Sequence, residues 1–250
     1  MIGKSSLSYL TPSWSAPACV KAYVSTRQGG VSEGEFGSLN LGGHVGDEIN
    51  DVKQNRQLFS SDLAMPNSIV WLNQVHGTNV VVLPSNDNEL DADAAVTAQI
   101  GQVCAVLTAD CLPVFFCNKQ GTQVGVAHAG WRSLCSGVLE NTLKHFSAPS
   151  DVLVWFGPAI GSAAFEVGED VRDAFITKNA EAEAAFVFQG NGKWLADLYL
   201  LARQRLSACG VAEIYGGDCC TYQDQARFFS YRRDGKTGRM ASVIWLDDDF

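Results

Sequence analysis

Apolar residues recur along the chain with two different spacings, which predict an interleaved set of strands and helices. Short apolar runs that are rich in β-branched residues and bounded by Gly, Asn, Asp or Pro predict strands. The predicted strands are Val20–Thr26, Thr78–Leu83, Val103–Leu107, Leu112–Phe116, Gln123–Ala127, Val152–Phe156 and Ala241–Leu246. Apolar residues at helical spacing predict helices. The predicted helices are one that begins within Asp51–Leu58, one that runs from Gly130 to Phe146, and those near Glu169–Asn179 and Leu195–Ala208.

The order of these elements predicts the fold class. Strands and helices alternate irregularly, and several connections between strands are too short for a helical crossover. This order favours an α+β fold, with mixed β-sheets flanked by outer helices, over a regular parallel barrel. No repeat, low-complexity tract or proline-rich linker divides the 250 residues. We therefore expect a single domain over residues 1–250, with residues 1–19 as an N-terminal extension of the same domain.

Composition and charge narrow the classes of ligand. Eighteen basic and 27 acidic residues give a formal net charge of -9, and no run of Lys or Arg is long enough to follow a row of phosphates, so nucleic acid is not an expected ligand. No apolar stretch is long enough to span a bilayer, and the N-terminal segment lacks the core of a signal peptide, so we expect a cytoplasmic protein with no membrane partner. The eight cysteines are scattered through apolar segments, which predicts free and mostly buried thiols. The sequence leaves the oligomeric state open.

Two of the four histidines and one cysteine lie where a metal site can form. His76 in NQVHGTNV and His128 in VAHAGWR lie where a predicted strand meets a loop or a helix, and Cys111 in TADCLPV lies in the short connection between two predicted strands. Ligands at strand ends can converge on one point. Two imidazoles and a thiolate suit a zinc ion with a fourth position open for catalysis, although the thiolate also suits copper. The alternative is that the histidines are ordinary core or surface residues and that Cys111 is a small buried hydrophobe.

Two polar residues next to these ligands are candidates for supporting roles. Asp110 directly precedes Cys111, and Gln74 lies two residues before His76. Each is placed to orient a ligand or a metal-bound water. Asp110 is also a candidate general acid or base. The alternative is that both are ordinary polar groups of turns.

Two further segments favour binding of an anion or an aromatic base. Arg27 and Asn40, in the glycine-rich stretch RQGGVSEGEFGSLNLGGHVGD, and Arg56 after it are candidates for binding an anion. The alternative is a surface loop with solvated arginines. In RFFSYRRDGKTGRM, aromatic residues alternate with arginines, which suits a pocket wall that holds a base and a negative charge. The alternative there is a β-hairpin around DGKTG, with the aromatic side chains inward and the arginines outward.

Taken together, STRQGGVSEGEFGSLNLGGHVGD, NQVHGTNV, TADCLPV, HAGWR and FFSYRRDGKTGRMAS resemble the bacterial YfiH family, also called the laccase-domain or multicopper polyphenol oxidase family. The resemblance runs from about residue 20 to the C-terminus. It implies mixed sheets flanked by helices and a single zinc ion bound by His76, Cys111 and His128. Ser133 after HAGWR and the paired cysteines of GDCCTY depart from the family pattern, which leaves the shape of the pocket open.

The resemblance also implies a function. Family members resemble zinc-dependent phosphorylases that split adenosine, inosine and methylthioadenosine into free base and pentose 1-phosphate, with adenosine deamination as a second activity. The expected partners are therefore small purine nucleosides and phosphate. In this scheme Arg27 and Arg56 balance the anion, and Asn40 fixes the sugar or the base. An older family name is copper-dependent polyphenol oxidase, or laccase, and another family role is editing of peptidoglycan precursors.

The residues themselves leave other functions open. Cys111 as a nucleophile with His128 as its base would make a metal-free cysteine hydrolase, but His76 would then have no role. A fourth ligand, such as His44 or another cysteine, would close the site and make a non-enzymatic, zinc-stabilised binding module. Four histidines are too few for a conventional multicopper oxidase. The nucleobase-deaminase signature, His-x-Glu followed by Pro-Cys-x-x-Cys, is absent from the sequence.

Overall fold

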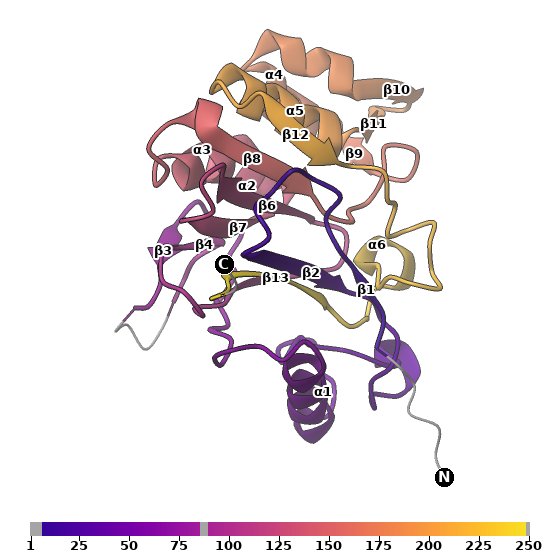
Figure 1. The fold of residues 1–250 in the computed structure, drawn as a ribbon. Coiled ribbons are helices and arrows are strands. Elements are labelled where there is room, and N and C mark those ends of the chain that lie inside the picture. Colours follow the sequence, from indigo (N-terminus) through magenta and orange to yellow (C-terminus); the bar gives the residue numbers. More distant parts are fainter. Residues whose placement is uncertain (1–6, 86–89, 249–250) are drawn as a thin grey trace.

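The computed structural model describes residues 7–85 and 90–248, and residues 1–6 of the predicted N-terminal extension lie outside this part (Figure 1). A six-stranded mixed sheet forms the centre of the molecule, with the strand order β12-β8-β6-β7-β4-β3. Its strands are β12 (Glu213–Gly216), β8 (Val152–Phe156), β6 (Leu112–Asn118), β7 (Val124–Ala129), β4 (Ala94–Thr97) and β3 (Val80–Val82). The two outer pairs, β12 with β8 and β3 with β4, are parallel, and the inner pairs are antiparallel.

Two antiparallel sheets accompany the central one. The four-stranded sheet has the order β1-β2-β13-β5 and the small sheet the order β10-β11-β9. Their strands are β1 (Tyr9–Leu10), β2 (Val20–Ser25), β13 (Met240–Leu246) and β5 (Cys104–Thr108), then β10 (Phe186–Gly190), β11 (Lys193–Ala196) and β9 (Glu166–Gly168). Strand β13, near the C-terminal end of the chain, lies between β2 and β5 and joins them into one sheet.

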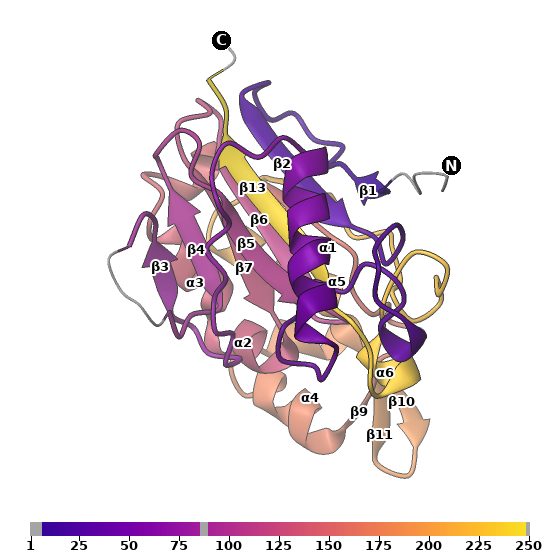
Figure 2. The same ribbon diagram turned by 90° about the horizontal axis from the view of Figure 1, so that it is seen from below.

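The helices lie outside the two large sheets, as the irregular order of elements predicts (Figures 1 and 2). They are α1 (Ile49–Asp62), α2 (Trp131–Ser136), α3 (Val138–Leu143), α4 (Glu169–Ile176), α5 (Leu198–Ala208) and the short α6 (Tyr231–Asp234). Short 3-10 turns occupy Gly34–Phe36, Pro149–Asp151 and Ala180–Ala185. None of the helices within the described ranges is long and apolar enough to cross a bilayer.

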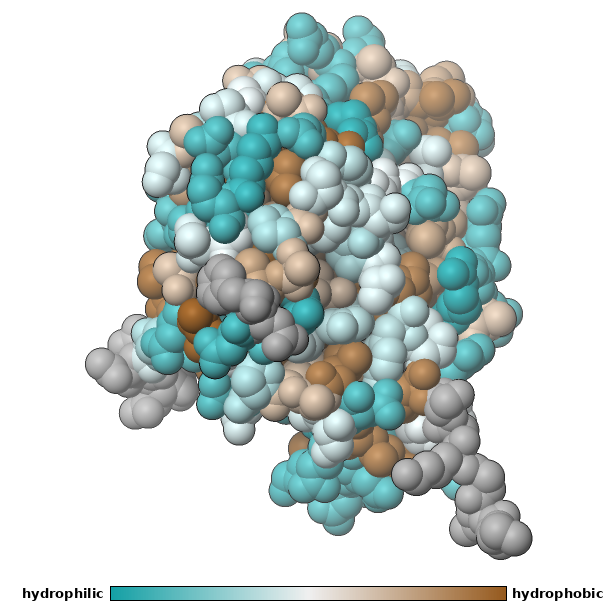
Figure 3. All heavy atoms as spheres, viewed as in Figure 1, coloured by the Kyte–Doolittle hydropathy of each residue, from teal (hydrophilic) through white to brown (hydrophobic). Residues whose placement is uncertain are grey.

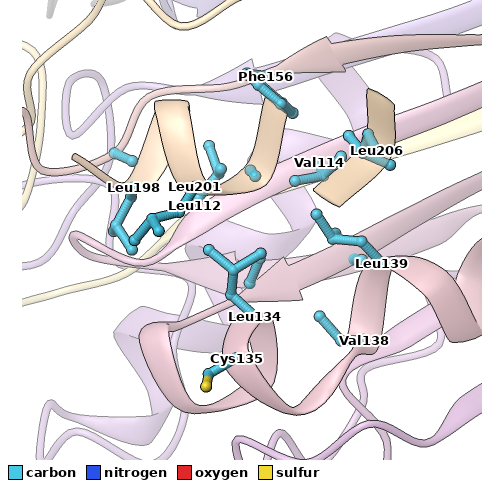
Figure 4. Close-up of a cluster of buried hydrophobic side chains, with 14 of the residues drawn as sticks. Leu112, Val114, Leu134, Cys135, Val138, Leu139, Phe156, Leu198, Leu201 and Leu206 are labelled. Atoms are coloured by element: carbon cyan, nitrogen blue, oxygen red, sulfur yellow. The ribbon is translucent and has the colours of Figure 1, made fainter. Parts of the chain in front are cut away.

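Alternating side chains divide the interior into layers. On β6, Phe115 and Cys117 point into a core shared with the four-stranded sheet, whereas Val114 and Phe116 point into the core beneath α2–α5. Figure 4 shows this second core, where leucines of α3 and α5 meet the sheet. A third core lies between the four-stranded sheet and α1, which contributes Phe59. The visible surface of α1, at the bottom of Figure 3, is mostly hydrophilic. The prediction of an α+β fold in one domain is confirmed.

Several predicted elements differ in detail. The single helix predicted from Gly130 to Phe146 is wrong, because Gly137 takes a left-handed conformation (φ 106°) and divides it into α2 and α3. The hairpin around DGKTG, which was the alternative to a pocket wall, does not form, since α6 occupies Tyr231–Asp234. The helix predicted from Leu195 begins at Leu198, because β11 extends to Ala196 and the Asp197 side chain caps the helix by accepting from the Leu200 N–H.

The cysteines are free thiols, as predicted. Cys19, Cys104, Cys117 and Cys135 are buried, and Cys111, Cys209, Cys219 and Cys220 are half-buried. Cys104 and Cys117 thus lie inside the sheets, whereas Cys111 lies at the end of the central sheet. Burial raises the pKa of the Cys117 thiol to about 12, which keeps it protonated.

Candidate active site and metal centre

Two histidines and one cysteine meet at one end of the central sheet. His128 lies on β7, Cys111 directly precedes β6, and His76 lies in the connection that leads to β3. Their ligand atoms all lie within 4.8 Å of one another. The Cys111 Sγ is 3.8 Å from the His76 Nε2, and the two imidazole rings are 4.8 Å apart at their centroids. The structure therefore brings together the three ligands that the sequence predicts.

The backbone at two of these positions has an uncommon conformation. His76 has φ 57° and Asp110, immediately before Cys111, has φ 92°. Residues other than Gly rarely adopt this left-handed backbone conformation. Such strained conformations are concentrated at functional sites. The sheet and the turn therefore hold Cys111 and His76 toward each other at a cost in conformational energy.

Asp93, which we did not single out in the sequence, fixes both histidines. Its Oδ1 accepts hydrogen bonds from the His128 Nδ1 (2.8 Å) and from the His76 N–H (3.1 Å). Its Oδ2 accepts from the N–H groups of Val75 and Gly77. Because an ionised carboxylate only accepts, the Nδ1 of His128 carries the proton and its Nε2 is left for a ligand. The side chain of Asp93 is fully buried.

A glycine makes the close approach of the three ligands possible. A Cβ at Gly130 would lie 2.8 Å from the His76 Cδ2 and 3.1 Å from the Cys111 Sγ. Both distances are shorter than ordinary contacts between carbon, or carbon and sulfur, atoms. The lack of a side chain at Gly130, at the junction of β7 and α2, therefore leaves room for His76 and Cys111 to approach the backbone.

The charges in the site favour a thiolate. Burial disfavours the Cys111 thiolate, but the charge and hydrogen bonds of His128 and His76 outweigh burial and lower the pKa of Cys111 to about 6. Burial alone would lower the pKa of His128, yet the Cys111 thiolate and Asp93 raise it to about 9. Without a metal, the group thus behaves as a thiolate–imidazolium pair at neutral pH.

The donor set fits one metal ion of the zinc class. Two imidazole nitrogens and a thiolate are the ligands that zinc accepts in catalytic sites with an open position. Asp93 supplies the hydrogen bond that usually orients a ligating imidazole. Among residues 7–85 and 90–248, these three side chains form the one group of three or more His, Cys, Asp or Glu that can bind a metal. Thiolate ligation also suits copper, so the ligands alone do not select zinc.

A cavity of about 350 Å³ opens beside the three ligands. Its wall includes Gln74, which was predicted, together with His44, Thr108, Tyr231 and Arg239. Gln74 is held rigidly, because its amide donates to the Leu107 carbonyl (2.8 Å) and accepts from the Leu107 N–H (2.7 Å). Burial, then the charges of Arg239 and Arg56, lower the pKa of His44, so that its imidazole is neutral at pH 7.

The other residues that were predicted to bind substrate lie outside this cavity wall. Arg27 donates to the carbonyls of Gly37 and Gln225 and stacks on Phe229. Arg56 donates to the Leu41 carbonyl and stacks on Trp71. In these positions both guanidinium groups stabilise loops, and direct contact of either with substrate stays a prediction.

Asn40 and Asp110 organise the segments that surround the cavity. Asn40 is fully buried, and its Oδ1 accepts from the N–H groups of Gly42 and Arg239. The Asp110 carboxylate accepts from the Thr221 hydroxyl (2.6 Å) and from the Arg232 N–H (2.7 Å). Both oxygens of Asp110 are therefore engaged with the C-terminal segment, and its role as an acid or base stays a prediction.

Comparisons with known proteins place this site in a family. Residues 21–247 match the family model described as multi-copper polyphenol oxidoreductase laccase. The chain belongs to this family. The match covers the elements that carry His76, Cys111 and His128, as well as the segment with Arg239.

Relatives in the family align over nearly their whole length. A Pseudomonas aeruginosa protein named purine nucleoside phosphorylase is 52% identical over 242 residues, which are 96% of this chain and 99% of that protein. An Escherichia coli protein of the same name is 53% identical over 239 residues, 95% of this chain and 98% of that protein. The crystal structure of a Neisseria meningitidis protein, 51% identical, superposes with a TM-score of 0.91 over 96% of this chain and 99% of that chain. The fold is therefore shared over 96% of this chain.

Proposed function

We propose that this protein is a zinc-dependent purine nucleoside phosphorylase, with zinc bound by His76, Cys111 and His128. The observation that carries the proposal is a single His2Cys group beside a cavity whose wall holds an arginine and no Asp or Glu among the described residues. A cavity of this kind accepts a phosphate anion next to a neutral nucleoside. Relatives that share about half of the sequence carry the name of this activity.

The reaction exchanges one bond at the sugar for another. An oxygen of hydrogen phosphate bonds to C1′ of the pentose, the C1′–N9 bond breaks, and its electron pair goes to N9 of the purine. The proton that phosphate gives up is taken up by the purine, which leaves the free base and pentose 1-phosphate. Positive charge develops on the sugar, as in glycoside hydrolysis. The site must therefore hold the phosphate anion against C1′ of the bound nucleoside.

Residues of the cavity are arranged for this positioning. The exposed ring of Tyr231 and the side chain of Leu107 offer apolar surface for the purine, and the fixed amide of Gln74 defines one wall. Arg239 supplies positive charge for the anion. Zinc, when bound, supplies a Lewis acid that stabilises negative charge on an oxygen ligand. Asp93 keeps the imidazole of His128 oriented throughout.

Adenosine deamination is proposed as a second and slower activity. It needs an acid or base to move protons, and the Asp110 carboxylate must first give up its hydrogen bonds to Thr221 and Arg232. We therefore expect more free base than deaminated nucleoside from adenosine.

Other functions would give different experimental results. The thiolate–imidazolium pair of Cys111 and His128 also suits a metal-free cysteine hydrolase, which would stay active in chelator. A multicopper oxidase would need further copper sites, and the described residues contain one group of ligands. Editing of a peptidoglycan precursor and a closed structural zinc site are the remaining alternatives, the second of which would exclude exchangeable water from the metal.

A phosphate-dependence assay tests the proposal. Zinc-loaded protein is incubated with adenosine or inosine, with and without phosphate, and free base is resolved from deaminated nucleoside. We expect base release that requires phosphate, is lost in Cys111→Ala and in chelator, and returns on addition of zinc to the wild type. Turnover in chelator, or base release at the same rate without phosphate, would contradict the proposal.

We also propose a cytoplasmic location, because eight cysteines without a disulfide are typical of proteins in a reducing compartment. Cell fractionation, with the protein found in the fraction of a known cytosolic enzyme, tests this location.

A further inference from the structure

Arg239 is the arginine on the wall of the cavity that contains His76, Cys111 and His128. Within the described residues it makes no ion pair, whereas Arg172, Arg205, Arg227 and Arg233 each pair with a carboxylate. The whole chain carries a formal charge of -9, so a cavity without acidic side chains and with a cation on its wall is a local reversal of the protein's charge. Such a reversal draws an anion into the cavity.

The guanidinium of Arg239 is held in one orientation. Its Nη1 donates to the carbonyls of Thr237 (2.9 Å) and Gly238 (3.0 Å). Its backbone N–H donates to the Asn40 Oδ1, and its side-chain stem packs so closely on Gly42 that a Cβ there would lie 2.7 Å from the Arg239 Cγ. The glycine-rich loop therefore positions Arg239.

This orientation leaves one edge of the guanidinium without a protein acceptor. Within the described residues, the Nε and Nη2 of Arg239 have no hydrogen-bond partner, and the ring of Tyr231 lies 5.9 Å from its Cζ. Two N–H groups on one edge of a guanidinium match two oxygens of a phosphate. A lysine cannot reproduce this paired geometry.

A second wall residue has an unused hydroxyl. Thr108, at the end of β5, is 2% exposed, lines the cavity, and its Oγ1 has no hydrogen-bond partner among the described residues. A buried hydroxyl without a partner is costly unless a ligand satisfies it. A phosphate oxygen is a suitable acceptor for it. The neutral imidazole of His44, on the same wall, offers a further N–H donor.

We propose that Arg239, with Thr108 and His44, forms the phosphate-binding subsite of this cavity. Arg239 takes two oxygens through Nε and Nη2, and Thr108 donates its hydroxyl to the anion. In this arrangement Arg27 and Arg56 act at a distance, through the loops that they stabilise, and Asn40 positions Arg239. The assignment rests on the proposed function, since phosphate is the co-substrate of that reaction.

Steady-state kinetics of zinc-loaded variants test the assignment. We expect Arg239→Gln to raise the KM for phosphate ~10 to 100-fold, the loss that accompanies removal of charged hydrogen bonds, and to change the KM for inosine by less than about threefold. Arg239→Lys retains the charge and recovers part of the loss. Thr108→Val raises the KM for phosphate about 3 to 10-fold.

Arg203→Gln is the matched control. Arg203 also donates to two carbonyls, of Ile214 and Gly216, and also lies over an aromatic ring, that of Phe156, but it is not on the cavity wall. We expect its KM for phosphate to equal that of the wild type. A KM for phosphate within about twofold of the wild type in both Arg239→Gln and Thr108→Val, with unchanged zinc content, would overturn the assignment.

Calorimetric titration of inorganic phosphate into the zinc-loaded proteins separates this assignment from the proposed function. If the wild type binds phosphate, Arg239→Gln binds it at least about tenfold more weakly and no nucleoside is cleaved, the subsite stands and the proposed function fails. If nucleoside is cleaved with phosphate but binding does not depend on Arg239, the function stands and the subsite is overturned. Equal phosphate binding by the wild type and Arg239→Gln, or none by the wild type, also overturns it.

Discussion

Replacement of Asp93 by Asn tests how the metal ligands are held. The change keeps the size of the side chain and removes its charge. In the native site, each oxygen accepts two hydrogen bonds: Oδ1 from the His128 Nδ1 and the His76 N–H, and Oδ2 from the N–H groups of Val75 and Gly77. An Asn amide has one acceptor oxygen, so whichever way it is placed, two of the four donors face an NH2 group.

The expected cost follows from these lost contacts. Hydrogen bonds to a charged group contribute about 1.5–3 kcal/mol each, and loss of one partner of a buried pair costs about 3–5 kcal/mol. We therefore expect Asp93→Asn to reduce the free energy of unfolding of the metal-free protein by about 3–5 kcal/mol. Because the imidazole of His128 loses its orienting acceptor, we also expect about 10 to 100-fold weaker zinc binding.

Two measurements check this prediction. Urea denaturation of the metal-free protein gives the change in the free energy of unfolding, and competition with a chromophoric chelator gives the Kd for zinc. Asp91→Asn is the control, because Asp91 lies two residues earlier, is itself exposed, and its carboxylate accepts from the exposed Asn73 amide. A folded Asp93→Asn protein whose zinc Kd and stability both match those of Asp91→Asn would refute the role assigned to Asp93.

Three further predictions concern the same region and its support. The Cys111 thiol of metal-free protein should react with iodoacetamide half-maximally near pH 6, where its pKa is about 6, and more slowly as the pH falls and the thiolate is protonated; a midpoint near pH ~8.5, that of an ordinary thiol, would contradict this. Gly130→Ala should lower zinc content below about one tenth of the wild type, measured by atomic emission, because its Cβ would lie 2.8 Å from the His76 Cδ2; stoichiometric zinc would refute the close approach. Gly137→Ala should lower the free energy of unfolding by about 1–2 kcal/mol in urea, because its φ of 106° disfavours a Cβ, and an unchanged midpoint would refute this reason.

The sequence predicts β6, β7 and β8 of the central sheet because these strands are buried on both faces. Val114 and Phe115 point into different cores, so the run from Leu112 to Phe116 is continuously apolar and easy to recognise. Strand β4 was missed because ADAAV consists largely of small residues with low β-propensity. Its burial comes from its neighbours β7 and β3, which no local pattern records.

The regular spacing of apolar residues also conceals the break between α2 and α3. The apolar residues between Trp131 and Phe146 keep their spacing because α2 and α3 both face the same core. Only the conformation of Gly137 separates the two helices, and a glycine within an apolar helical pattern does not by itself reveal a positive φ. In the C-terminal segment, the alternative of a hairpin fails because Ser230 caps α6 by accepting from the Arg233 N–H.

The candidate metal ligands were predictable from the sequence, and the residues that support them were not. His76, Cys111 and His128 are chemically distinctive, and strand ends bring them together. Asp93 is one of several acidic residues in NDNELDADAA, and its role depends on a turn that points three N–H groups at it. Arg239 was one of several arginines in its segment, and only the packing of Gly42 and Asn40 against it shows which one meets the cavity.

Phosphorus NMR of a reaction with inosine tests the central claim most directly. Zinc-loaded protein, phosphate and inosine should give a phosphate-ester resonance of pentose 1-phosphate in an amount equal to the free base released. The signal should be absent with Cys111→Ala, which lacks the thiolate of the metal site. Release of free base with no phosphate ester, or no turnover by protein with one bound zinc per chain, would contradict the assignment of this cavity to purine nucleoside phosphorolysis.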